Sequence, residues 1–306
     1  MEHAEIKHWR DHAGPVRDQV RGFEVIACET CGFKHIIPIP SAEELEEVYR
    51  QEYYSKDKPL YLEHHKEDLP WWNSVYAERY ALFETHLPGA RRRILDVGSG
   101  PGYFLLHGRE RGWETVGMEP SSQAAAHSRD LGLTIVEDFL CPRTAAGIGM
   151  FDAVHMSEVL EHIPEPKSLL ETAGRLLGPG GIICVVVPND YNPFQDILRH
   201  ARGFAPWWVA PPHHINYFDF ESTRRLIEAA GFEVVHSQAT FPIDVFLLMG
   251  DNYIGNDTLG RQCHARRKTF ELTLAAAGAA DLKSRLYQAF AELGIGREVI
   301  VYGRKP

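Results

Sequence analysis

The feature that most constrains the fold is a glycine-rich turn directly after a short apolar segment. Residues 94–102 read Ile-Leu-Asp-Val-Gly-Ser-Gly-Pro-Gly, and the run 93–97 is typical of a buried strand in a parallel sheet. Glycines remove side chains where the backbone must pass close to a ligand. In a doubly wound α/β sheet such a turn lies at the carboxyl edge, where ligands bind. The segment therefore predicts a site for a nucleoside-like cofactor.

Two details of this turn favour S-adenosylmethionine over a dinucleotide. The carboxylate of Asp96 would repel a diphosphate, whereas S-adenosylmethionine carries a sulfonium and an ammonium and no phosphate. The third glycine, Gly102, comes one residue too early for the dinucleotide fingerprint. Glu119 ends the next apolar run, where a carboxylate can accept hydrogen bonds from both ribose hydroxyls. Glu119 also suits NAD, so by itself it indicates nucleoside binding only.

Four further segments follow the glycine turn in chain order: 116–120, 136–139, 151–163 and 176–189. Together the five segments resemble the motifs of the class I S-adenosylmethionine-dependent methyltransferases. The resemblance implies a Rossmann-like, doubly wound α/β fold with a seven-stranded sheet whose last strand is antiparallel, and it implies methyl transfer from S-adenosylmethionine. The implied cofactor-binding residues are Asp96, Gly98, Ser99, Gly100, Gly102, Glu119, Pro120, Asp138, Phe139 and Ser157.

Chain breakers and periodicity divide the sequence into three parts. Residues 1–40 form a knuckle-like segment with strands expected at 22–27 and 34–39, and residues 41–90 supply N-terminal helices or a lid. Ser41 followed by Glu44 predicts a helix start, with the helix over 43–49. Residues 91–306 form the catalytic domain, interrupted by a helical insertion at 241–295. The apolar face of this insertion suits either a cap over the acceptor pocket or a homodimer contact.

The N-terminal segment contains a candidate zinc site. Cys28 and Cys31 form a Cys-x-x-Cys pair before a glycine, and His8 and His12 lie upstream at helical i, i+4 spacing. Two imidazoles and two thiolates complete a tetrahedral zinc site. Sugar-modifying methyltransferases that resemble this chain carry paired Cys-x-x-Cys knuckles, and this chain lacks the first pair. A reduced, metal-free hairpin is the alternative, and a zinc ion here would be structural.

The chemistry is expected at the carboxyl ends of the fourth and fifth strands. Methyl transfer from a sulfonium is an in-line displacement, and a hydroxyl acceptor must also lose its proton. The predicted general base is His214, which lies in an aromatic, proline-rich loop, and Glu158 is the second predicted catalytic residue. Trp207 and Trp208 in this loop suit the apolar face of a sugar ring or a flat base.

A divalent cation is an open alternative for this site. Glu158, Glu161 and His162 follow the fourth strand at i, i+3, i+4 spacing, which would place them on one helical face. This Glu-x-x-Glu-His grouping resembles that of the ubiquinone-pathway and small-RNA 2′-O-methyltransferases, in which these residues and a later histidine hold a divalent cation. Here the later histidine would be His214. In metal-free relatives the same residues make local hydrogen bonds.

The acceptor is expected to be a small molecule. Likeness of the knuckle and of residues 214–218 to sugar-modifying relatives predicts methylation of a sugar hydroxyl, as a sugar nucleotide or glycan precursor. Alternatives are a quinone-like or natural-product O-methyltransferase, a C- or N-methyltransferase, and a silent cofactor-binding module in a biosynthetic complex.

Charge and hydropathy exclude other classes of function. The net charge of −10 disfavours a nucleic-acid surface, and the basic run 261–268 is expected to be a solvated helix face. No apolar stretch approaches the length of a membrane span, and the first residues lack a signal-peptide pattern. The sequence therefore predicts a cytoplasmic protein.

Overall fold

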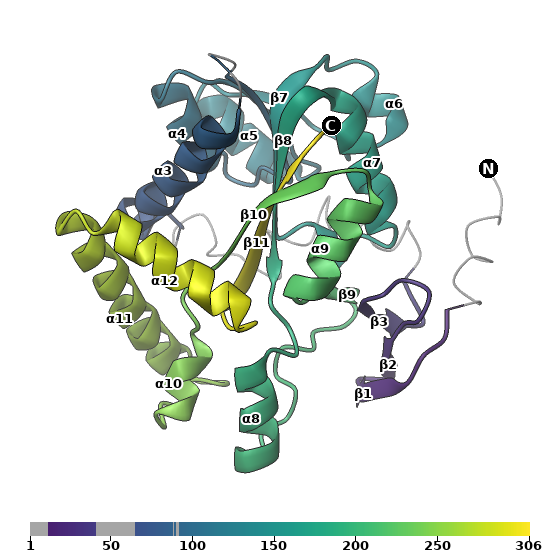
Figure 1. Cartoon of the computed structure of the whole chain (residues 1–306), viewed down its shortest axis with the longest axis vertical. Helices are drawn as coiled ribbons and strands as arrows, with labels where there is room; N and C mark the ends of the chain where they lie inside the picture. The colour runs from purple at the N-terminus through teal and green to yellow at the C-terminus, as the bar shows by residue number, and fades with distance from the viewer. Residues whose placement is uncertain (1–11, 41–64, 88, 90–91) are drawn as a thin grey trace.

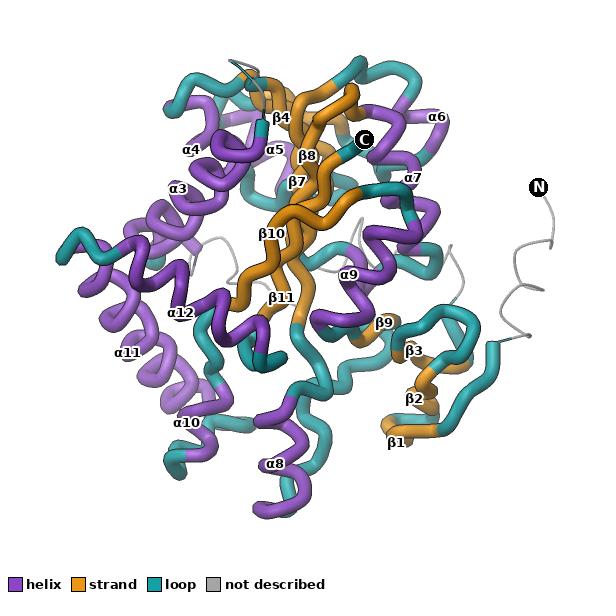
Figure 2. Tube along the Cα trace, viewed as in Figure 1, coloured by secondary structure: helices purple, strands orange, loops and turns teal. Residues whose placement is uncertain are grey.

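A computed structural model describes residues 12–40, 65–87, 89 and 92–306. The helix expected over 43–49 and the candidate ligand His8 lie outside these residues. A seven-stranded sheet runs through the main body with helices on both faces (Figure 1, Figure 2). Its strand order is β10-β11-β8-β7-β4-β5-β6.

The strands of this sheet follow the apolar runs of the sequence. They are β4 Arg93–Val97, β5 Glu114–Met118, β6 Thr134–Val136, β7 Phe151–Ser157, β8 Leu177–Pro188, β10 Glu233–Ala239 and β11 Glu298–Arg304. Strands β4 to β8 pair in parallel, and β11 runs antiparallel to both of its neighbours, β8 and β10. The predicted doubly wound sheet with an antiparallel last strand is confirmed.

Helices cover both faces of the sheet and bury one hydrophobic core on each (Figure 2). The helices that follow or precede these strands are α3 Leu69–His86, α4 Tyr103–Glu110, α5 Ser122–Asp130, α6 Pro142–Ala145, α7 Pro166–Leu176, α8 Pro193–Arg202 and α9 Phe220–Ala229. On the α3 and α4 face, Tyr80, Phe83 and Tyr302 are completely buried. On the α7 and α9 face, Leu170 and Ile227 are completely buried. Each such side chain stabilises the fold by about 1.5–3 kcal/mol.

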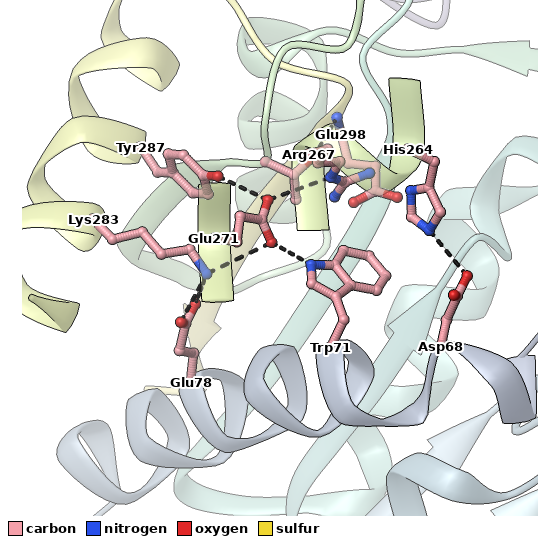
Figure 3. Close-up of polar contacts among 10 residues, drawn as sticks. Asp68, Trp71, Glu78, His264, Arg267, Glu271, Lys283, Tyr287 and Glu298 are labelled. Carbon is pink, nitrogen blue, oxygen red and sulfur yellow. Dashed lines mark hydrogen bonds and ion pairs between the residues drawn. The ribbon is translucent and has the colours of Figure 1, made fainter. Parts of the chain in front are cut away.

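The predicted insertion is helical and consists of α10 Asp244–Leu248, α11 Asp257–Ala276 and α12 Ala280–Glu292. Helix α11 packs on α3, and α12 packs on β10 (Figure 1). A buried polar network joins these helices (Figure 3). At its centre the carboxylate of Glu271, only 2% exposed, accepts hydrogen bonds from the indole of Trp71 at 2.5 Å and from the hydroxyl of Tyr287 at 2.8 Å.

Two cations complete this network. The guanidinium of Arg267 lies 3.3 Å from Glu271 Oε1, and the ammonium of Lys283 lies 3.8 Å from Glu271 Oε2 and 2.8 Å from Glu78 (Figure 3). Burial alone would raise the pKa of Glu271, but the charges of Arg267 and Lys283 lower this pKa below its ordinary value. The network therefore fixes the insertion onto α3 through buried ion pairs.

The basic run on α11 is only in part the solvated face that was expected: Arg261 and Arg266 are exposed, whereas Arg267 is buried and Lys268 is half-buried. Its cations pair with acids, most of them on other segments: Arg261 with Glu67, Arg266 with Asp251, Arg267 with Glu271 and Lys268 with Asp68. Each of these neighbouring cations is thus paired with a different carboxylate in the folded protein.

A second, smaller sheet contains the N-terminal segment. Its antiparallel order is β1 Val16–Val20, β2 Phe23–Ala27, β3 Lys34–Ile37 and β9 Asn216–Tyr217. Strands at 22–27 and 34–39 were expected, whereas β1 and β9 were not. Trp208 is buried in the core of this sheet against Val25 and Ile36. Within the described ranges, none of the helices has the length and apolar character to cross a bilayer.

Candidate active site

A cavity of about 320 Å³ lies at the carboxyl ends of β4, β5 and β7. Six of the predicted cofactor-binding residues line it: Gly98, Glu119, Pro120, Asp138, Phe139 and Ser157. The predicted catalytic residue Glu158 and the imidazole of His162 line the same cavity. The fold thus brings six of the ten expected cofactor residues, together with Glu158 and His162, to one cavity.

The glycine turn has the backbone conformation and the close contacts that require glycine. Gly98, Gly100 and Gly102 have φ values of 70°, 51° and 78°, which side chains other than glycine rarely adopt. A Cβ atom on Gly98 would lie 2.7 Å from the side chain of Val159, and one on Gly102 would lie 2.6 Å from Ser128 Oγ. Of these glycines, Gly98 lies at the cavity and presents bare backbone to it.

Glu119 is held rigidly by this turn. Its two carboxylate oxygens accept backbone hydrogen bonds from Gly100 at 2.8 Å and from Ser121 at 2.9 Å. Burial raises the pKa of Glu119 to about 7, although the two backbone donors lower it in part. Each carboxylate oxygen can accept a second hydrogen bond, so the group retains capacity for ribose hydroxyls.

Ser99 adds an observation that fits a bound cofactor. Its hydroxyl oxygen is buried and has no hydrogen-bond partner within the described part of the chain. A buried hydroxyl without a partner costs free energy. Ser99 is not among the described residues that line the cavity, so its predicted cofactor role stays a prediction.

Asp96 lies on the α3 side of the sheet and is bonded to a histidine. His155 Nδ1 is 2.7 Å from Asp96 Oδ1, and the guanidinium of Arg79 is 3.2 Å from His155 Nε2. Because a guanidinium only donates, His155 Nε2 accepts and its Nδ1–H donates to Asp96. Because Nε2 accepts from Arg79, the ring is neutral. Burial lowers the pKa of His155, and Asp96 offsets part of this shift. Arg79 and His155 were missed by the sequence analysis: Arg79 lies outside the five motif-like segments, and His155 lies within segment 151–163 but was given no role there.

Asp96 is accordingly not among the described residues that line the cavity, and neither are Ser99, Gly100 and Gly102. The predicted attraction of Asp96 for a sulfonium stays a prediction, because the carboxylate already accepts a hydrogen bond from His155.

A carboxylate and two imidazoles form a compact cluster beside the cavity. Ligand atoms of Glu161, His162 and His214 all lie within 4.8 Å of one another. His162 Nδ1 donates to the backbone oxygen of His213 at 2.7 Å, and His162 Nε2 lies 3.8 Å from Glu161 Oε1. The rings of His162 and His214 meet edge-on, with centroids 4.9 Å apart. The structure thus brings together three groups from segments about fifty residues apart in the sequence.

The expected helical face at 158–162 is wrong. Residues Leu160–His162 form one 3-10 turn, and Glu158 precedes it with a φ of 55°. Glu158 therefore does not join the cluster of Glu161, His162 and His214. His162 lines the cavity, whereas His214 is not among the described lining residues and lies against the His162 ring.

The knuckle-like segment also brings its predicted ligands together. His12, Cys28 and Cys31 lie in one cluster, and the fourth member is His35 on β3. His35 was missed by the sequence analysis, although the spacing Cys-x-x-Cys-x-x-x-His was available as a signal. His8 lies outside the described residues.

Fold and site together define the class of protein. A doubly wound sheet with one antiparallel strand, a left-handed glycine turn and an acid after the next strand are the features expected of class I S-adenosylmethionine-dependent methyltransferases. Residues 65–237, more than half of the chain, match the methyltransferase domain family, and the chain belongs to this family. The predicted class, enzyme type and cofactor, S-adenosylmethionine, are confirmed.

Curated relatives and solved structures agree with this assignment. The chain is 33% identical over 102 residues to the ubiquinone biosynthesis O-methyltransferase of Actinobacillus pleuropneumoniae serotype 7, covering 30% of this chain and 44% of that protein. It is 32% identical over 163 residues to that of Chromobacterium violaceum, covering 48% of this chain and 66% of that protein. The chain thus spans about half the length of these relatives.

The crystal structure of the plantazolicin methyltransferase BamL in complex with a triazolic desmethylPZN analog and SAH has a similar fold. It has a TM-score of 0.52 and 14% sequence identity, and the match covers 86% of this chain and 97% of that chain.

Proposed function

We propose that this protein transfers a methyl group from S-adenosylmethionine to a hydroxyl of a quinone-like, phenolic small molecule. The observation that carries the proposal is the position of the His162 imidazole, which lines the same cavity as Gly98 and Glu119 and belongs to a cluster with Glu161. A methyl donor and a base at one opening are what O-methylation of a hydroxyl requires.

The choice of a phenolic acceptor over a sugar follows from two observations. The sugar hypothesis rested on likeness of the knuckle and of residues 214–218 to sugar-modifying relatives. Trp208, which was expected to suit a sugar ring or a flat base, is buried in the small core with residues of β2 and β3. The curated relatives are named ubiquinone biosynthesis O-methyltransferases, which supports the quinone-like alternative. Phenolic hydroxyls also lose their protons more readily than those of sugars, with a pKa of about 10 in tyrosine.

The proposed mechanism uses the chain's own residues as follows. Glu119 accepts hydrogen bonds from the ribose, and Asp138 and Phe139 hold the adenine. The hydrogen bond to the oxygen of His213 requires a proton on His162 Nδ1, so Nε2 of the neutral ring carries a lone pair and takes the proton of the acceptor. Glu161 stabilises the imidazolium that forms. A cofactor-binding module without catalytic activity would not need this base, so the base favours an enzyme.

The acceptor class can be tested by measuring S-adenosylhomocysteine formation with a panel of substrates. We expect turnover with a catechol or a hydroxylated quinol and none with a sugar nucleotide. The reverse pattern would restore the sugar hypothesis. Turnover only with an amine or an activated carbon acceptor would reassign the enzyme to N- or C-methylation.

The cofactor role of Glu119 gives a prediction that is independent of the acceptor. Glu119→Gln keeps the size of the side chain but turns one acceptor into a donor that faces a backbone N–H. We expect binding of 5′-methylthioadenosine, measured by calorimetry, to weaken by about 1–3 kcal/mol. Glu114→Gln, at the other end of β5, is the matched control and should bind normally. Equal affinities of the wild type, Glu119→Gln and Glu114→Gln for 5′-methylthioadenosine would show that Glu119 does not bind the cofactor.

The raised pKa of Glu119 predicts a pH dependence of the same binding. The ionised carboxylate offers more acceptor positions to the ribose than the protonated acid. Affinity for 5′-methylthioadenosine is therefore expected to fall as the pH drops through about 7, and the fall should be absent in Glu119→Gln. This nucleoside lacks the amino-acid group of the cofactor, which would otherwise contribute its own titration. A flat profile in the wild type would contradict the prediction.

A further inference from the structure

A second cluster of metal-ligand side chains lies in the small N-terminal sheet, apart from the methyltransferase cavity. Cys28 follows β2, Cys31 lies in the turn, His35 is on β3, and His12 precedes β1. One ligand atom from each of the four lies within 4.8 Å of all the others. Cys28 is 3% exposed and His35 is fully buried, so these donors converge inside the protein.

The distances between the donors fit the edges of a zinc tetrahedron. His12 Nδ1 lies 3.3 Å from Cys31 Sγ, 3.6 Å from Cys28 Sγ and 3.1 Å from His35 Nε2. Zinc bonds of 2.0–2.1 Å to nitrogen and about 2.3 Å to sulfur, in tetrahedral geometry, separate neighbouring ligand atoms by about 3.3–3.8 Å. The cluster is therefore close to the geometry needed without a large rearrangement.

The surroundings orient the donors for a metal ion. His35 Nδ1 lies 3.0 Å from the backbone oxygen of Ile36, so this nitrogen carries the proton and Nε2 directs its lone pair at the cluster. Such a hydrogen bond on the far ring nitrogen is usual for histidines that bind metals. The backbone N–H of Cys31 donates to Cys28 Sγ at 3.4 Å, which favours a thiolate there.

The cluster is connected to the methyltransferase site through backbone hydrogen bonds. In the β3–β9 pairing, His35 lies opposite Asn216, two residues after His214. The N–H of Ile36 donates to the oxygen of Ile215 at 2.9 Å, and the N–H of Ile215 donates to the oxygen of Glu161 at 2.7 Å. Two successive hydrogen bonds, both made by Ile215, thus connect the β3 backbone to the segment that carries Glu161 and His162.

We propose that His12, Cys28, Cys31 and His35 bind one structural zinc ion, which fixes β3 and, through β9, holds His214 against His162. His35 takes the place that the sequence analysis gave to His8. Zinc binding itself is independent of the proposed function, whereas its effect on turnover rests on that function. The zinc site fixes the position of the loop that carries His214, and the metal takes no part in methyl transfer.

Metal analysis of the full chain, purified without chelator, tests the ligand set. We expect about one zinc per chain, and Co²⁺ substitution should give the absorption bands of a tetrahedral site with thiolate ligands. The metal should be lost in His35→Ala and in Cys31→Ser, whose cysteine is partly exposed. The control variants His8→Ala and Cys263→Ala should keep it. Loss in His8→Ala with retention in His35→Ala would overturn the assignment of His35. A wild-type protein that takes up no zinc even when zinc is supplied would overturn the site.

Hydrogen exchange tests the coupling without any need for activity. Removal of zinc should speed exchange of the Ile36 and Ile215 amides, while exchange in β4 and binding of 5′-methylthioadenosine stay unchanged. Unchanged exchange of Ile215 after complete zinc removal would disprove the coupling even if the site holds zinc. If these amides respond but no phenolic acceptor is ever methylated, the proposed function fails and the zinc site stands.

Discussion

Replacing His162 with alanine is expected to lower turnover by roughly 10²–10⁴, the usual contribution of a general base. The physical reason is that His162 is the imidazole that lines the cavity, with a tautomer fixed by the oxygen of His213. Affinity for 5′-methylthioadenosine should change little, because the imidazole acts on the acceptor. Single-turnover kinetics with a phenolic acceptor would measure the methyl-transfer step directly.

The loop offers a matched control for this variant. His213 contributes only its backbone oxygen to His162, so His213→Ala should retain turnover. Removal of His214, the base predicted from the sequence, should lower turnover less than removal of His162, since His162 lines the cavity and His214 is not among the described lining residues. Wild-type turnover in His162→Ala, with methyl transfer rate-limiting, would contradict this assignment and make Glu158 the next candidate.

The same variants separate a base from a divalent cation. If Glu161, His162 and His214 hold a cation that binds the acceptor, removal of any one should be equally damaging and a chelator should abolish turnover. With a base, turnover should resist the chelator, and His162→Ala should be the most damaging of the three changes. Zinc in the N-terminal cluster must be followed in the same samples, so that its loss is not mistaken for loss of a cation here.

Glu271→Ala is expected to lower the free energy of unfolding by about 3–5 kcal/mol, as when one partner of a buried ion pair is removed. The change leaves the charges of Arg267 and Lys283 buried without their shared carboxylate, and it removes the acceptor of Trp71 and Tyr287 (Figure 3). Denaturant unfolding would measure the loss. Glu292→Ala, at an exposed position on α12, is the control and should be nearly neutral.

The pH dependence of stability has a definite sign. Because the pKa of Glu271 is lowered in the folded protein, its contribution is present above the unfolded pKa, about 4.3 for glutamate, and is lost as the pH falls below it. Glu271→Ala should therefore lose stability at neutral pH and approach the wild type in acid. A destabilisation of less than 1 kcal/mol at neutral pH, or one that grows in acid, would contradict the proposed role of the network.

Most of the large sheet was predictable because each buried strand is a local apolar run. The expected strands at 93–97 and 176–189 correspond to Arg93–Val97 and Leu177–Pro188. Strands β1 and β9 were missed for a physical reason. Val16–Val20 has one buried residue and three polar ones, and Asn216–Tyr217 is a two-residue strand that exists only because β3 pairs with it. Neither carries a local pattern.

In the candidate site, too, residues in local motifs were predictable and residues brought together by the fold were not. The glycine turn and Glu119 were predictable because they lie within one strand-turn-helix-strand unit. The spacing of Glu158, Glu161 and His162 was misleading because the chain makes a left-handed turn at Glu158 and only a single 3-10 turn after it. Arg79 reaches His155 from a helix that carries no motif, so only the folded chain could identify it.

The position of β11 has a consequence for synthesis of the chain on the ribosome. This strand lies between β8 and β10, so the two facing strand edges remain without their partner until residues 298–304 have emerged. The segment between β8 and β11 takes roughly 5–20 s to translate at ordinary rates. Unpaired apolar edges are templates for association with other chains. These edges therefore stay open to association with other chains until β11 has emerged and paired with both of them.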